Sequence, residues 1–245
     1  MPNYGPSNAF LFVTGAELSG YTFDMSEGQE HAVQPSHGLG DTMEESLPVG
    51  IMKTILETGN GFYDESVGNI NAAYQSMGAT RQLACYGFAG KTLGKDAIII
   101  DGTYANQWKR TATRDGITLG KATHTVDGRR WQGKIVHPAT AVTADGNTQS
   151  TPVDNAASSA SGGVADLHVA ALTLGGYTSV TVKVRHSADN VTYADLCTFT
   201  VVTAIGFAER QTIAGTINRY LAISYEFNGA GSGQSISPLV VVARG

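Results

Sequence analysis

The stretch SVTVKVRHS, residues 179–187, points most directly to a fold. Its three valines occupy every second position, and threonine, lysine and arginine follow them in between. A period of two is typical of a β-strand that buries one face and exposes the other. The stretch therefore predicts a half-buried strand.

Segments on both sides of this stretch repeat the pattern. Leu221, Ile223, Tyr225 and Phe227 alternate with other residues, and runs such as DLHVAALTL, ADLCTFTVV and ERQTIA follow one another at short intervals. Turn-forming clusters such as SADN and AGT separate these runs. Short strands at this spacing predict an antiparallel β-sandwich.

Composition changes abruptly near residue 141. Large apolar residues nearly vanish between Ala141 and Val164, where Ser, Thr, Ala, Gly, Asn and Asp dominate. Such a run buries too little apolar area to offset its ordering entropy as a core element. We therefore expect two domains, residues 1–140 and 141–245, with a linker and the first peripheral strand of the second domain within 141–164.

Residues 1–140 combine strand patterns with one helix pattern. Within residues 66–78, apolar residues recur at spacings of three and four between a serine and a glycine, which predicts a helix of about three turns. Asp127-Gly128 predicts a tight hairpin between two strands. Strands are expected at 9–13, 49–63, 81–90, 96–110, 117–126 and 130–137. The predicted fold class is mainly β: an N-terminal β-barrel or sandwich with one short helix, then a C-terminal antiparallel β-sandwich.

A cluster of three carboxylates could indicate chemistry. Asp41, Glu44 and Glu45 lie within five positions of one another in GLGDTMEESLPVG, residues 38–50. The nearby His31 and His37 match no common spacing of metal ligands. The other four histidines lie in strand patterns, without partners close in the sequence.

Other sequence motifs add no chemistry. GFAGKTLGK resembles a phosphate-binding loop only superficially, because position 85 is cysteine where that motif requires glycine. Cys85 and Cys197 lie far apart in apolar runs, which predicts two buried free thiols. We therefore predict no catalytic residue, no cofactor and no metal site.

The sequence shows no targeting or membrane signal. No basic and then apolar leader opens it, so we expect no secretory signal. No window approaches about 18 consecutive apolar residues, so we expect no membrane span. The protein is expected to be made and kept in a cytoplasm unless something other than a signal peptide exports it.

Charge is distributed unevenly along the chain. Residues 1–65 carry ten acids and one base, a net charge of −9, whereas residues 66–140 carry ten bases and four acids, a net charge of +6. The two parts can neutralise each other within one fold. They can also form opposite faces, so that the basic surface of one copy meets the acidic surface of the next. The sequence leaves both alternatives open.

Several segments resemble a known family. In chain order, LFVTGAELSG, GLGDTMEESLPVGIMKTILETGNGFYDES, YGFAGKTLGKDAIIIDGTYANQWKR and LGKATHTVDGRRWQGKIVHP resemble tail tube (major tail) proteins of long-tailed bacteriophages. The resemblance covers roughly residues 8–140 and rests on element order and local phrasing. VTVKVRHSADNVTYADLCTFT and GTINRYLAISYEF look like galactose-binding-like jelly-roll modules that many phage virion proteins carry.

This resemblance implies a structural virion protein without enzymatic activity. Subunits of that family form hexameric rings that stack into a hollow tube around a tape-measure protein, and a tail terminator is a further implied partner. Double-stranded DNA later passes through the tube without specific binding. The implied location is the virion tail, assembled in the host cytoplasm, and the C-terminal domain would project outward as a decoration.

The resemblance and the charge pattern together select candidate residues. An acidic wall suits a DNA conduit, because like charges repel. The candidate acidic lumen or interface residues are Asp24, Glu27, Glu30, Asp41, Glu44 and Glu45. The candidate basic inter-subunit face consists of Lys109, Arg110, Arg114, Arg129 and Arg130.

Two alternatives remain open at this point. The chain could be a carbohydrate-binding virion protein of a tail tip or capsid surface, recognising host surface glycans through Tyr177 and Tyr193. It could also be a hydrolase that uses the cluster of Asp41, Glu44 and Glu45.

Overall fold

A computed structural model describes residues 9–19, 25–35, 46–62, 81–112, 119–146 and 151–245. β-Strands are nearly the only regular secondary structure of the described residues, which confirms the predicted mainly-β fold class. The predicted helix at 66–78 lies outside them. The strands are β1 (Phe10–Val13), β2 (Ala16–Glu17), β3 (Met25–Pro35), β4 (Ser46–Phe62), β5 (Gln82–Gly87), β6 (Asp96–Thr111), β7 (Leu119–Val126), β8 (Arg130–Pro138), β9 (Val153–Asp154), β10 (Gly163–Thr173), β11 (Ser179–Ser187), β12 (Ala194–Thr198), β13 (Ala208–Ile213), β14 (Tyr220–Asn228) and β15 (Ser235–Arg244).

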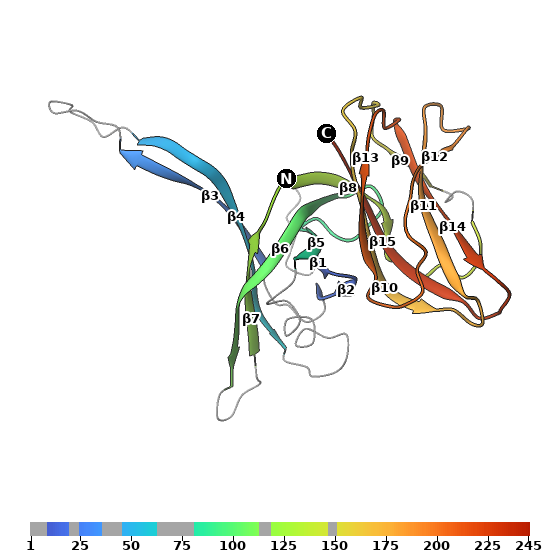
Figure 1. The fold of residues 1–245 in the computed structure, drawn as a ribbon, viewed down its shortest axis with the longest axis horizontal. Coiled ribbons are helices and arrows are strands. Elements are labelled where there is room, and N and C mark those ends of the chain that lie inside the picture. Colours follow the sequence, from blue (N-terminus) through green and yellow to red (C-terminus); the bar gives the residue numbers. More distant parts are fainter. Residues whose placement is uncertain (1–8, 20–24, 36–45, 63–80, 113–118, 147–150) are drawn as a thin grey trace.

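The C-terminal half forms a β-sandwich (Figure 1). One layer is the four-stranded sheet β12-β11-β14-β9, and the other is the β13-β10-β15-β8 part of a much larger sheet. Val182 of β11 and Val240 of β15 belong to one buried apolar cluster between the layers. All three valines of 179–187 are fully buried, as their period of two predicts. We refer to these two layers as the sandwich.

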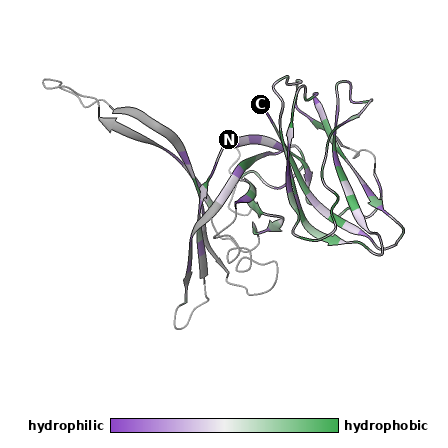
Figure 2. Ribbon diagram, viewed as in Figure 1, coloured by the Kyte–Doolittle hydropathy of each residue, from purple (hydrophilic) through white to green (hydrophobic). Residues whose placement is uncertain are grey.

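β10 and β15 bury both of their faces. Leu167 and Val240 pack in the sandwich core. Leu239 and Val241 point the other way, into a second core that also contains Phe12. This second core lies inside the curl of the large sheet, whose strands follow the order β13-β10-β15-β8-β6-β5-β1-β2. Figure 2 shows hydrophobic residues on the sandwich strands and on β1, β2 and β5.

The large sheet is continuous between the two halves of the sequence. β8 comes from the N-terminal part, yet it pairs with β15 from Leu239↔Pro138 to Ala243↔Gly133. Parts of 141–164 belong to the sandwich or pair with it: β9 pairs with β14, and Val142 forms a β-bridge with Ile236. The division into domains at about residue 140 stays a prediction.

The predicted hairpin at Asp127-Gly128 is wrong. β7 and β8 do not pair with each other; both pair with β6, through Thr103↔Val126 and Ile100↔Arg130. Gly128 has a φ of +98°. The positive φ expected of glycine in such a turn is therefore present, but the bend joins β7 and β8, which lie one after the other along the same edge of β6.

At this bend the sheet divides. β7 continues to β4 and β3, whereas β8 continues to β15. The strands β3, β4, β7 and β6 form what we call the arm sheet. The hairpin of β3 and β4, which we call the arm, projects away from the rest of the molecule, and the sandwich lies at the opposite end of the long axis (Figure 1).

Candidate functional site

The arm sheet has two open strand edges. Among the described residues, β3 pairs with β4 and with no other strand. β6 pairs with β7 through Thr103–Thr111, but on its other edge β5 reaches only from Tyr86↔Ile98 to Gln82↔Thr103. The backbone of residues 104–111 therefore has no partner strand on that edge among the described residues. Such edges carry unpaired N–H and C=O groups that can template pairing with another chain.

The two faces of the arm sheet differ in character. Pairing register and the alternation of side chains define each face. One face covers an apolar core, where Leu56 and Ala122 are fully buried with Tyr86 and Ile100. The other face, which we call the polar face, consists of Ser26, Gly28, Glu30, Lys53, Ile55, Glu57, Gln107, Lys109, Thr111, Lys121, Thr123 and Thr125, all exposed or partly exposed.

Charges on the polar face nearly balance. Glu30 lies directly opposite Lys53 in the β3–β4 register, and Lys121 Nζ lies 3.5 Å from Glu57 Oε2. Lys109, directly opposite Lys121, is exposed. The face thus carries three lysines and two glutamates, so its described residues supply no net negative charge.

The predicted acidic residues do not all share one surface. Glu30 belongs to the polar face, but Glu27 lies on the opposite face of β3. The Glu27 carboxylate accepts hydrogen bonds from Arg130 Nε at 2.5 Å and Nη2 at 3.4 Å. Burial and the Glu27 charge raise the pKa of Tyr86 above its ordinary value. Asp24, Asp41, Glu44 and Glu45 lie outside the described residues.

The predicted basic residues are also dispersed. Lys109 is exposed on the polar face. Arg130 pairs with Glu27 inside the chain, and the exposed Arg129 stacks on the Trp131 ring with Cζ 3.8 Å from the ring centroid. Arg114 and the side chain of Arg110 lie outside the description.

Among the residues that the structure describes, acids of the first 65 residues pair with bases of residues 66–140 at three places. These pairs are Glu17–Lys91, Glu27–Arg130 and Glu57–Lys121. For these six side chains, the charge asymmetry in the sequence is neutralised within the chain.

A buried ionic network lies where the large sheet divides. Arg210 of β13 donates from Nε and Nη2 to the two carboxylate oxygens of Asp166, each at 2.6 Å. Its Nη1 donates to Asp101 Oδ1 of β6 at 2.6 Å, and Trp131 Nε1 donates to the same oxygen at 2.8 Å. Burial, reinforced by the Asp101 charge, raises the pKa of Asp166 to about 6, although Arg210 opposes the shift.

Sequence reasoning missed this network. Asp166 and His168 look like the outward residues of an alternating strand, yet both are fully buried in the second core. One signal was present: LVVVA, residues 239–243, is an uninterrupted apolar run of the kind found in strands covered on both faces.

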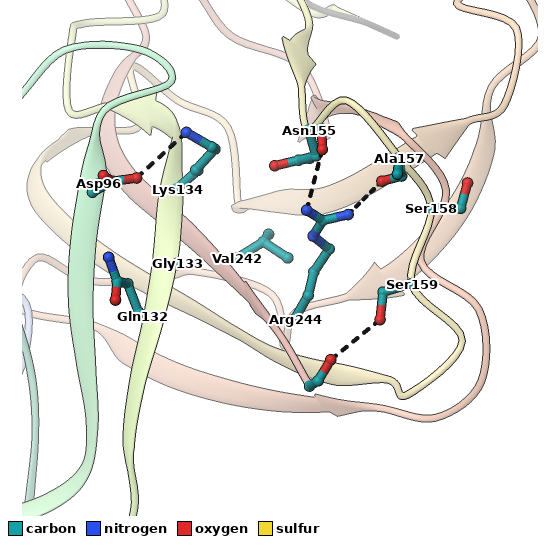
Figure 3. A pocket seen from close by; sticks show the side chains of 11 residues that line it. Asp96, Gln132, Gly133, Lys134, Asn155, Ala157, Ser158, Ser159, Val242 and Arg244 are labelled. Atoms are coloured by element: carbon teal, nitrogen blue, oxygen red, sulfur yellow. Dashed lines mark hydrogen bonds and ion pairs between the residues drawn. The ribbon is translucent and has the colours of Figure 1, made fainter.

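A polar groove lies where β6 and β8 meet the edge of the sandwich (Figure 3). It has a volume of about 410 Å³ and is lined by β6, β8, the end of β15 and residues 155–159. Arg244 Nη1 donates to Ala157 O, and Nη2 donates to Asn155 O at 3.3 Å. Across the groove, Lys134 Nζ lies 3.4 Å from Asp96 Oδ1.

The described residues contain no cluster of three or more His, Cys, Asp or Glu that could hold a metal ion. His37, and the side chain of His31, lie outside them. Burial lowers the pKa of His124 to about 4, and burial with the Arg210 charge lowers that of His168 to about 3. Both cysteines are free thiols; Cys85 is buried and Cys197 partly buried.

Tyr177, one of the two predicted platform residues, is partly buried. Its ring packs at 5.5 Å from that of Phe227 and against the sandwich core. The Tyr193 hydroxyl donates a hydrogen bond to Asn190 Oδ1 at 2.5 Å.

In the part of the chain that the structure describes, no helix is long and apolar enough to span a bilayer.

Comparison with known proteins gives a distant likeness among solved structures. No family model and no curated protein matches the chain. Among solved structures, the chain is similar to the SPP1 Dit (gp 19.1) protein, described as a paradigm of the hub adsorption apparatus in phages that infect Gram-positive bacteria. The TM-score is 0.37 and the identity 10%, over 97% of this chain and 99% of that one. A TM-score this low does not establish a shared fold.

Proposed function

We propose that the chain is a structural subunit of a phage tail, which closes into hexameric rings that stack into the tail tube. The two open edges of the arm sheet are the observation that carries this proposal. Pairing the β3 edge of one copy with the β6 edge of the next is a heterologous contact, and such contacts close into rings when the rotation per copy permits. Closure satisfies the unpaired backbone groups of every copy.

In this proposal the polar face lines the lumen, because the opposite face already covers an apolar core. The tape-measure protein and later double-stranded DNA would occupy the lumen, and a tail terminator would cap the tube. Lysines near glutamates give DNA little net charge to bind. An acidic lumen would then depend on acids outside the described residues, such as the predicted Asp24, Asp41, Glu44 and Glu45.

The sandwich is proposed to lie outside the ring, since it occupies the end of the molecule opposite the arm (Figure 1). The proposed role involves no catalysis. Glycan recognition by the sandwich is the weaker candidate, because Tyr177 is used in packing.

Electron microscopy and amide hydrogen exchange of the purified chain test the proposal. Rings or tubes should form at high concentration. In these particles, residues 25–35 and 104–111 should gain protection relative to the dilute protein, because their outer N–H groups become paired. β11, already paired on both edges, is the internal control.

A protein that stays monomeric at high concentration would contradict the proposal. Particles in which both edge segments exchange as fast as in the monomer would show that assembly uses another surface.

A further inference from the structure

The polar groove contains a cation without an acidic partner. Among the described residues, the Arg244 guanidinium forms no ion pair, and its two hydrogen bonds go to backbone carbonyl oxygens. A guanidinium has five N–H donors, so these two bonds leave donors for another acceptor. Lys134 adds a second positive charge across the groove, and Asp96 is the one residue among those that line it with an acidic side chain.

The groove is built to receive a polar segment. Its volume of about 410 Å³ falls within the usual size of a ligand site. Ser158 and Gln132 line it with exposed side chains, and no aromatic residue does. Cationic and hydroxyl donors without an apolar floor favour a carboxylate-bearing chain.

The tip of the arm supplies such a chain. Residues 36–45, SHGLGDTMEE, connect Pro35 to Ser46 at the outer end of the arm and contain three acids and no lysine or arginine. The arm and the sandwich lie at opposite ends of the long axis (Figure 1). In a stack of rings, an arm that extends toward the next ring would bring these three acids to the surface of a second copy.

We propose that the groove between β8, β15 and residues 155–159 binds the acidic arm tip of a second copy. The carboxylates of Asp41, Glu44 and Glu45 would accept hydrogen bonds from Arg244 and Lys134. This contact rests on the self-assembly proposed above and adds to it a defined socket, distinct from the open strand edges.

A direct test measures binding of a fluorescent peptide with the sequence of residues 36–45 to the full chain at a concentration where it is monomeric. Ser158 is exposed, and its side chain forms no hydrogen bond to any residue that the structure describes, so S158E and S158K change the groove charge without removing a described contact. We expect S158E to weaken binding and S158K to tighten it, each about threefold at low salt. Both effects should fade at high salt, because ions screen exposed charges.

The matched control is the same peptide with D41N, E44Q and E45Q. It should bind more weakly and should not distinguish S158E from S158K. Equal binding of the acidic and neutral peptides, or indifference of the acidic peptide to position 158, would overturn the proposal.

A second experiment separates this proposal from the assembly proposal. In the full chain, R244E should impair ring stacking, and the charge swap with E44R and E45R should restore it partly. If R244E and wild type form the same tubes, the socket is wrong and the tail tube proposal stands. If no variant assembles, the peptide measurement still decides the socket.

Discussion

Replacing Arg210 with methionine should destabilise the protein strongly at neutral pH. The substitution keeps much of the apolar stem but removes the partner of Asp166, which has no exposed side-chain surface. Asp101 then adds a like charge nearby. Breaking a buried ion pair from one side typically costs about 3–5 kcal/mol.

Protonation sets an upper limit on this cost. In R210M, Asp166 can become neutral by binding a proton. Protonation costs about 1.4 kcal/mol for each pH unit by which the solution lies above the ordinary carboxyl pKa of 3.8. The limit is therefore roughly 4 kcal/mol at pH 7 and roughly 2 kcal/mol at pH 5. Because a raised carboxyl pKa means that the folded state binds the proton more tightly, the penalty must shrink as the pH falls.

Urea unfolding of R210M at the two pH values measures this difference. Fluorescence of Trp131 reports on the network directly, since its indole N–H binds Asp101. The double variant D166N/R210M should be clearly more stable at pH 7 than R210M, since no unpaired charge remains. R219M is a matched control, because Arg219 pairs with Asp154 on the surface, and it should change stability little.

The reasoning fails if R210M costs less than about 1 kcal/mol at pH 7. It fails equally if the cost is the same at pH 5, since the burial of an ionised Asp166 would then not be its origin.

Three further predictions follow from the same region. G128A should lower the thermal midpoint more than G94A, because both glycines have positive φ but only at Gly128 would a Cβ meet the Asp101 side chain, at 2.7 Å. H168Q should flatten the loss of stability between pH 6.5 and about 3, because the lowered pKa of His168 makes the unfolded state bind more protons there, as urea titrations across that range would show. A fragment of residues 1–140 should expose apolar surface and bind a hydrophobic dye, because it lacks Leu239 and Val241 of the second core; a cooperative, dye-silent fragment would contradict this.

Local patterns predicted the strands well, because a period of two records which side chains a sheet buries. The valines of 179–187 and the apolar run before Asp101 both lie in strands as expected. What such patterns do not contain is the partner of each strand. Asp127-Gly128 specifies a backbone conformation, and that conformation serves a bend between strands as readily as a hairpin.

The candidate charges show the same limit. Counting acids and bases along the chain located a charge asymmetry, but the strand register determines which of these charged side chains pair with each other. Glu27 and Glu30 lie three positions apart and therefore on opposite faces of β3, so one pairs with Arg130 and the other lies on the polar face. Likewise, Asp166 and Arg210 are 44 positions apart and meet because β10 and β13 are neighbours.

The shared strands also bear on how assembly and decoration are related. β6 contributes an open edge at residues 104–111, and its first residues pair with β8, which pairs with β15 of the sandwich. The Asp101–Arg210 contact joins β6 directly to β13 of the sandwich. A sandwich attached through paired strands and a partly buried ion pair cannot rotate as it could on a flexible linker. If the arm sheets close into a ring, the sandwiches should therefore take fixed positions around it, and each groove should meet the neighbouring copy at a fixed angle.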